Sequence, residues 1–211
     1  MFKLNSRRSA GLVAAVVCML SLSATAQAAF LAVTATLFPA PAEPDPVGGV
    51  PIAFLAQPFN AGTFTGVLTS TVIAGDASNP FGGLTFTYRV SNDAASANVE
   101  SRLTVNGWSN FLTDASYQVP LSGINPGLID RITADVVGFS FLAMPLGGGQ
   151  VQPGTQSTLL VVQTNSPQFN NSFASVIDGT VASVPTFAPT PEPTTLALLG
   201  LGGLALIRRR R

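Results

Sequence analysis

Apolar and polar residues alternate strictly over residues 84–91. Leu84, Phe86, Tyr88 and Val90 fall on one face of an extended chain, and the residues between them are polar. A period of two is typical of a half-buried β-strand. Residues 99–105 follow the same pattern, and further strands are predicted at 63–73, 132–142, 155–164 and 173–184. Because no helical period of useful length occurs between residues 29 and 190, the pattern predicts an all-β domain.

Turn signals separate the predicted strands. Gly, Pro, Asn and Asp cluster between them, and Asp178-Gly179 predicts a tight hairpin turn. Within 132–142 the apolar residues change from one face to the other, which indicates a β-bulge near Gly138. Seven or eight short strands of this kind predict a β-sandwich, immunoglobulin-like or jelly-roll-like. The turn at 152–154 and the strand after it resemble a strand entry of bacterial immunoglobulin-like surface modules.

Residues 1–28 have the three parts of a secretory signal peptide. Basic residues precede an apolar run at 10–24, and the small residues Ala26 and Ala28 lie just before Ala29. We therefore expect signal peptidase to cleave before Ala29. A membrane anchor and a lipoprotein acceptor at Cys18 are the alternatives. The apolar run is short for a membrane span, and Val17 stands before Cys18 where a small residue is wanted.

The C-terminal segment also has three parts in a fixed order. Pro191, Glu192 and Pro193 precede twelve apolar residues at 196–207, and four arginines follow, namely Arg208, Arg209, Arg210 and Arg211. As a helix the apolar part would reach roughly 18 Å, less than the ~30 Å hydrocarbon core of a bilayer. The arginines would stay on the cytoplasmic side of the inner membrane. This pattern predicts transient insertion of a short C-terminal apolar helix.

This arrangement resembles the PEP-CTERM sorting signal. The resemblance implies recognition by exosortase, a membrane-embedded cysteine transpeptidase, and cleavage near Pro-Glu-Pro in a Gram-negative bacterium that makes extracellular polysaccharide. An ordinary tail anchor on a Pro-rich stalk is the alternative. The chain then divides into a signal peptide (1–28), a β-sandwich ectodomain (29–184), a Pro-rich linker (185–190) and a PEP-CTERM sorting signal (191–211). A second extended linker is expected at 39–51.

Composition narrows the classes of function. The chain has 10 Lys and Arg and 10 Asp and Glu, but seven of the basic residues lie near its two ends. Between residues 29 and 190, three Arg oppose nine acids, a net charge of −6, so nucleic acid is not expected as a partner. There is no His, and Cys18 is the single cysteine. These counts exclude His-based catalysis and zinc sites of imidazole or thiolate, and we expect no cofactor.

Two aromatic residues are candidates for ligand contact. Trp108 is the only tryptophan, and Asn106 and Asn110 flank it. With Tyr117 it could form a platform on which a sugar stacks, as in a carbohydrate-binding module. A lone tryptophan in a sandwich more often packs in the core or at its rim, and this is the interpretation that we favour.

The charged residues do not predict a catalytic pair. Asp130 and Asp135 are closest to one, but residues five apart in one strand point to opposite faces, so they could not flank one glycosidic bond. Glu100 and Arg102 share a strand face and are expected to be exposed to solvent.

No calcium-loop pattern and no metal site are predicted. An Asp-x-Asp-x-Asp run does not occur, although loop acids such as Asp76 and Asp93 could meet in space. The sequence therefore predicts an exported, non-enzymatic protein of the cell surface or extracellular matrix. The alternative is a secreted carbohydrate-binding module that interacts with extracellular polysaccharide, and an enzyme is the reading that the composition favours least.

Overall fold

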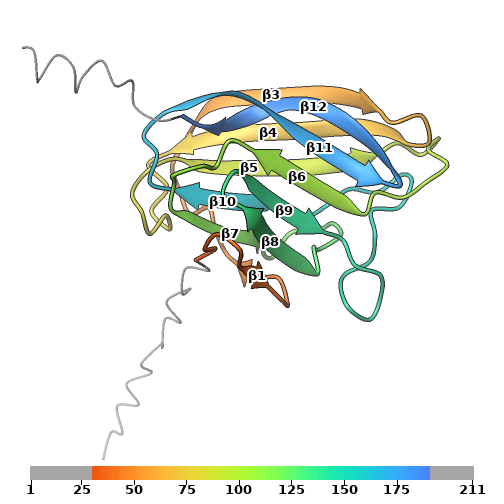
Figure 1. Ribbon diagram of the computed structural model, residues 1–211, viewed down its shortest axis with the longest axis horizontal. Helices are drawn as coiled ribbons and strands as arrows, with labels where there is room; N and C mark the ends of the chain where they lie inside the picture. The colour runs from red at the N-terminus through yellow and green to blue at the C-terminus, as the bar shows by residue number, and fades with distance from the viewer. Residues whose placement is uncertain (1–29, 191–211) are drawn as a thin grey trace, which may run out of the picture.

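The computed structural model describes residues 30–190, which form two six-stranded β-sheets (Figure 1). No helix occurs in this range. The prediction of an all-β, two-sheet domain is confirmed, and its immunoglobulin or jelly-roll type stays a prediction. The signal peptide at 1–28 and the sorting signal at 191–211 lie outside the described residues. In the part of the chain that is described, no helix is long and apolar enough to cross a membrane.

The first sheet, called sheet A, has the strand order β2-β7-β10-β5-β4-β3. Neighbouring strands are antiparallel, except that β2 runs parallel to β7. Its strands, in chain order, are β2 (Ala42–Glu43), β3 (Val50–Asn60), β4 (Thr65–Ala74), β5 (Thr85–Asn92), β7 (Thr113–Gln118) and β10 (Leu160–Thr164).

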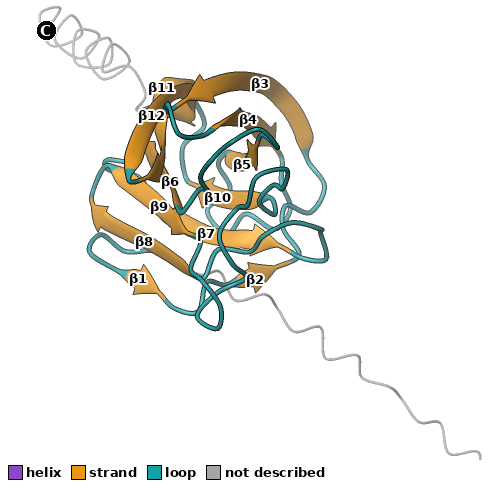
Figure 2. Cartoon of the chain, turned by 90° about the vertical axis from the view of Figure 1, so that its right-hand side faces the viewer, coloured by secondary structure: helices purple, strands orange, loops and turns teal. Residues whose placement is uncertain are grey.

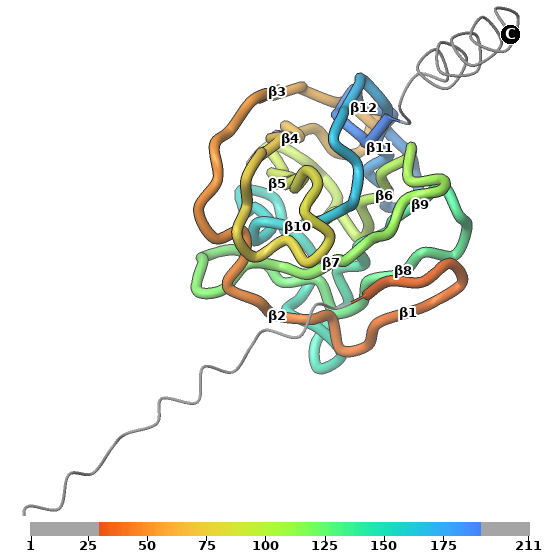
Figure 3. Tube along the Cα trace, turned by 90° about the vertical axis from the view of Figure 1, so that its left-hand side faces the viewer, coloured from red at the N-terminus to blue at the C-terminus, as the bar shows by residue number. Residues whose placement is uncertain are grey.

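The second sheet, called sheet B, has the order β1-β8-β9-β6-β11-β12 and is antiparallel throughout. Its strands are β1 (Thr36–Leu37), β6 (Arg102–Asn106), β8 (Leu128–Thr133), β9 (Val136–Ser140), β11 (Phe169–Asp178) and β12 (Thr180–Pro189). The two short strands β1 and β2 lie at one side of the sandwich, and β3 and β12 lie at the other (Figure 2, Figure 3).

The hydrophobic core fills the space between the two sheets. Phe86 and Tyr88 of β5 and Leu103 and Val105 of β6 are all nearly or fully buried there, as the alternation predicted for these two strands. The Tyr88 hydroxyl donates a hydrogen bond to the Phe187 carbonyl of β12 (2.8 Å). Because β12 also contacts β3 and β4 of the other sheet, this side of the sandwich is closed.

The prediction of a single strand at 132–142 is wrong. The chain instead forms two antiparallel strands, β8 and β9, with a turn at Ala134 and Asp135 between them. The hairpin reverses the chain, and this explains why the apolar residues change face. A register shift confirms the irregularity expected near Gly138, because it falls between the pairs Asp130–Gly138 and Thr133–Val136. The extra residue lies on β8 rather than on β9.

The prediction of a Pro-rich linker at 185–190 is also wrong, as is the prediction that the sandwich ends at residue 184. Strand β12 continues to Pro189, and its partner β11 pairs with it from Asp178 back to Phe169. Proline has no amide hydrogen to donate to a neighbouring strand, so within a sheet it is found in edge strands. Strand β12 is an edge strand of sheet B and can therefore contain these prolines. The expected hairpin is confirmed, with Gly179 at a φ of 65° in its turn. The other expected linker, 39–51, contains β2 and the start of β3.

Candidate functional site

A group of buried polar residues lies on the outer face of sheet A, away from the core. Side chains alternate along a strand, so Asp114 and Ser116 of β7 point outward while Ala115 between them enters the core. Asp114 lies opposite Gln163 of β10, and Gln163 lies opposite Thr85 of β5. These outward residues are all buried, although the outer face of a sheet is normally exposed to solvent.

The chain from Ala42 to Gly49, called the strap, covers this face. It starts as β2 beside β7 and then continues along sheet A to β3 (Figure 3). Ser116 Oγ donates to Asp45 Oδ2 (3.0 Å), and the Val47 amide donates to Asp76 Oδ1 (2.9 Å). The Ala77 amide in turn donates to the Val47 carbonyl (3.0 Å). The strap is thus tied to β7 and to the loop between β4 and β5.

Four acids meet under the strap and form what we call the acidic cluster. Glu43 and Asp45 come from the strap, Asp76 from the β4–β5 loop and Asp114 from β7. Their exposed fractions are 9%, 2%, 7% and 1%. Asp76, which the sequence offered as a loop acid for a calcium site, is therefore in a cluster, but with acids other than Asp93.

Asp76 has its hydrogen-bonding capacity filled. Ser78 Oγ donates to Oδ1 (2.6 Å), and Thr85 Oγ1 (2.7 Å) and Gln163 Nε2 (2.9 Å) donate to Oδ2. Burial alone would raise the pKa of Asp76, but the hydrogen bonds from Ser78, Thr85 and Val47 outweigh it and lower the pKa. Asp76 is therefore a charged carboxylate that holds the strap and the loop together.

The other acids of the cluster lack this support. Neither oxygen of Asp114 has a hydrogen-bond partner, and Oδ1 of Asp45 has none besides the neighbouring Glu43 carboxyl group. Burial, with the charges of Glu43 and Asp45, raises the pKa of Asp114 to about 7. Burial and the neighbouring Asp45 raise the pKa of Glu43 to about 7 as well, and burial raises that of Asp45. The negative charges are thus crowded and only partly compensated.

Glu100 is a second buried acid without partners. The expectation that it is exposed is wrong, because its exposed fraction is 0% and neither carboxylate oxygen has a hydrogen-bond partner. Its backbone pairs with Val151 in both directions, and Asn92 Nδ2 also donates to the Val151 carbonyl (3.0 Å). Burial and the charge of Asp93 raise the pKa of Glu100 to about 8. An open pocket of about 350 Å³ lies nearby, over Asn92 and Asp93.

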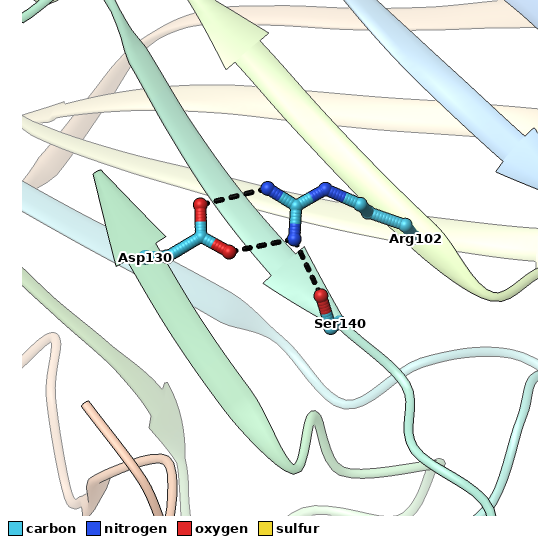
Figure 4. Close-up of polar contacts among 3 residues, drawn as sticks. All are labelled: Arg102, Asp130 and Ser140. Carbon is cyan, nitrogen blue, oxygen red and sulfur yellow. Dashed lines mark hydrogen bonds and ion pairs between the residues drawn. The ribbon is translucent and has the colours of Figure 1, made fainter. Parts of the chain in front are cut away.

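Arg102 is bound in an ion pair rather than free in solvent. Its guanidinium donates to both oxygens of Asp130 (2.6 and 2.7 Å) and to the Ser140 hydroxyl (Figure 4). The pair crosses β9 at Gly138, where a Cβ atom would lie 2.1 Å from Arg102 Nη2. Gly138 therefore leaves room for the ion pair. Asp135 lies in the β8–β9 turn and accepts from Ser109, so the structure does not bring it together with Asp130.

Trp108 does not form an exposed stacking platform. Its ring is fully buried and packs edge-to-face on Phe86, with 5.4 Å between the ring centroids. The buried Arg131 guanidinium donates to the Trp108 carbonyl (2.6 Å) and to the Thr113 hydroxyl, which fixes the loop after β6. Core packing, the role favoured for a lone tryptophan, is therefore confirmed for Trp108, and the possible ligand contact is not supported. Tyr117 is half-buried in β7 and packs against the core.

An all-β domain thus leads directly into the C-terminal segment that resembles a sorting signal. A family model described as the PEP-CTERM protein-sorting motif matches residues 189–211. This range contains the predicted signal residues Pro191, Glu192 and Pro193 and the four terminal arginines, and it confirms the resemblance. The chain is therefore a protein that carries a PEP-CTERM sorting motif.

The match begins at Pro189, the last residue of β12, and so includes two of the described residues, Pro189 and Thr190. No curated protein and no solved structure matches the chain. The predicted cleavage residues Ala26 and Ala28, like Pro191 to Arg211, lie outside the described residues.

Proposed function

We propose that this protein is an exported, non-enzymatic component of the cell surface or extracellular matrix. In this proposal signal peptidase removes residues 1–28, and exosortase processes the C-terminal motif while the apolar segment at 196–207 is in the inner membrane. The observation that carries the proposal is the PEP-CTERM motif at residues 189–211, directly after the last strand of the sandwich.

The connection between sandwich and motif supports a role in which the folded domain is the delivered cargo. The Thr190 amide donates to the Gln168 carbonyl (3.1 Å), and Ser166 Oγ donates to the Thr190 carbonyl (3.2 Å). The residue before Pro191 is therefore still hydrogen-bonded to the fold. Any attachment made near Pro-Glu-Pro would hold the sandwich itself, without an intervening stalk.

The environment of the acids supports the non-enzymatic part of the proposal. The carboxylates of the acidic cluster lie under the strap, and that of Asp130 is held by Arg102. General acid and base groups must reach the substrate within hydrogen-bonding distance, and these groups are covered or occupied. The carbohydrate-binding alternative is not proposed, because its main contact, Trp108, lies in the core.

Intact mass spectrometry of the exported protein tests the proposal, because one measurement reports both ends of the chain. We expect a mature protein that begins at Ala29 and ends close to Pro193. Glu192→Ala, or deletion of the four terminal arginines, should leave full-length precursor in the inner membrane. Asp178→Ala is the matched control, since it removes one carboxylate from the β11–β12 turn, outside the motif.

Two results would overturn the proposal. One is exported protein that keeps its four arginines in cells with a working exosortase. The other is normal processing of the Glu192→Ala variant, which would favour an ordinary tail anchor.

A further inference from the structure

The acidic cluster under the strap contains carboxylate oxygens that nothing in the described structure satisfies. Both oxygens of Asp114 lack hydrogen-bond partners although the residue is 99% buried, and Oδ1 of Asp45 has none besides the Glu43 carboxyl group. Buried polar atoms are nearly always paired, and an unpaired buried carboxylate is costly. These oxygens therefore indicate a missing partner.

The register of sheet A places these acids on one face of the sheet. Asp114 and Ser116 are two residues apart on one face of β7, a separation of roughly 7 Å. Because Ser116 Oγ holds Asp45 Oδ2 at 3.0 Å, the Asp45 carboxylate lies on the same face of sheet A as Asp114. Glu43 enters from β2, which pairs with the end of β7. The charges of Glu43 and Asp45 both act on Asp114, in agreement with this placement.

The missing partner is not a basic side chain within the described fold. The ion pair in residues 30–190 is Arg102–Asp130, on the outer face of sheet B. Asp114 accepts no hydrogen bond from the described residues, so its negative charge is uncompensated whenever the carboxyl group is ionised. A cation satisfies several carboxylate oxygens at once and cancels their mutual repulsion.

We propose that the acidic cluster is a binding site for a hard divalent cation of the calcium type, with Asp45, Asp114 and Glu43 as its carboxylate ligands. Calcium takes six to eight oxygen ligands in flexible geometry and accepts carboxylates together with backbone carbonyls and water. Asp76 keeps its own hydrogen bonds and positions the strap. The site has no His or Cys, so softer transition metals are disfavoured.

The carboxylate side chains of the acidic cluster are not preorganised around a cation. Within residues 30–190, no three acidic, His or Cys side chains are arranged to hold a metal ion. Binding therefore draws the strap carboxylates toward Asp114, and part of the binding free energy is used in that movement. We expect a dissociation constant on the order of 10⁻⁴ to 10⁻³ M, as in extracellular calcium modules.

Calorimetric titration of the EDTA-treated, full-length protein with calcium chloride at about pH 8 tests this inference. We expect one calcium ion per chain and a higher melting temperature in calcium. Asp114→Asn should weaken binding at least tenfold, because it keeps the shape of the side chain but removes the charge. Asp178→Asn, which changes an acid in the β11–β12 turn in the same way, should bind as the unchanged protein does.

Hydrogen exchange on the unchanged protein gives a readout that does not depend on the variants folding. Calcium should slow exchange in residues 42–47 and 113–118 and leave the β11–β12 hairpin unaffected. The inference is wrong if neither calcium nor magnesium at 10 mM binds or alters exchange there. It is also wrong if binding survives Asp114→Asn in full, or if acidification replaces the effect of calcium.

Discussion

Glu100 should make the protein less stable as the pH rises. In the folded protein its pKa is raised from 4.5 to about 8, first by burial and then by Asp93. The folded state therefore holds a proton that the unfolded state has released, between about pH 4.5 and pH 8. Stability from this group is complete below pH 4.5 and is lost as the pH rises through 8.

The Glu100→Gln variant isolates this effect, because glutamine fills the same space and does not titrate. One pH unit corresponds to about 1.4 kcal/mol, so between pH 5.5 and pH 9 the unchanged protein should lose about 3 kcal/mol relative to the variant. Urea unfolding at both pH values, in EDTA, measures the difference. With slopes of ~1–3 kcal/mol/M, the midpoints should separate by roughly 1–3 M.

The comparison with the variant is essential because other acids titrate too. Glu43 and Asp114 have raised pKa values and change stability in the same direction as Glu100, whereas Asp76 acts in the opposite direction. These contributions cancel when the two proteins are subtracted at each pH. An equal stability difference at pH 5.5 and pH 9 would refute the argument. Asp178→Asn provides the control for a general effect of charge.

Three further substitutions test the packing, each by urea unfolding at pH 6. Phe86→Ala should cost ~3–5 kcal/mol, because the ring is fully buried against Trp108, and a loss below 1 kcal/mol would contradict the sandwich core. Tyr88→Phe should cost ~1–3 kcal/mol, because it leaves the buried Phe187 carbonyl without its donor. Arg131→Met should cost at least ~3 kcal/mol, because several carbonyls, including that of Trp108, lose their charged donor.

Periodicity predicted the inner face of the sandwich well and its outer face poorly. The apolar side of β5 enters the core as expected, but Thr85 and Thr87 on its other side are also buried. Alternation in the sequence identifies the apolar residues that face the core. It does not show whether the polar residues of the outer face are exposed to solvent or covered by another segment such as the strap. The cover here is held by Asp76, Val47 and Gln163, whose contacts join segments far apart in the sequence.

Among the strands that the sequence did not predict, β3 and β7 were missed for different reasons. Strand β3 contains Pro51 and Pro58 and exposes Phe54 (66%), so it lacks both the composition and the polarity of an ordinary half-buried strand. The two prolines are tolerated because β3 is an edge strand of sheet A. Strand β7 has the sequence Thr-Asp-Ala-Ser-Tyr-Gln, in which the outward residues are buried and polar. No period of hydrophobicity marks it.

The acidic cluster could not be found from sequence spacing. Glu43 and Asp45 are a local signal, two acids separated by a proline, but Asp114 joins them only through the pairing of β2 with β7. A parallel contact between a two-residue strand and a distant one has no sequence signature. Glu100 was misjudged for a related reason: its burial depends on Val151, fifty-one residues further along the chain.

The connection between β12 and the sorting motif limits where the chain can be cut. Phe169 pairs with Pro189, and Thr190 is hydrogen-bonded to Gln168, so the β11–β12 ladder needs the chain up to residue 190. A cut before Pro189 would leave the end of β11 unpaired, on the side of the sandwich where Tyr88 binds Phe187. A cut at or after Pro191 keeps every one of these hydrogen bonds. The proposed cleavage near Pro-Glu-Pro would therefore release or attach a complete sandwich, and the new terminus would be within a few residues of the last hydrogen bond.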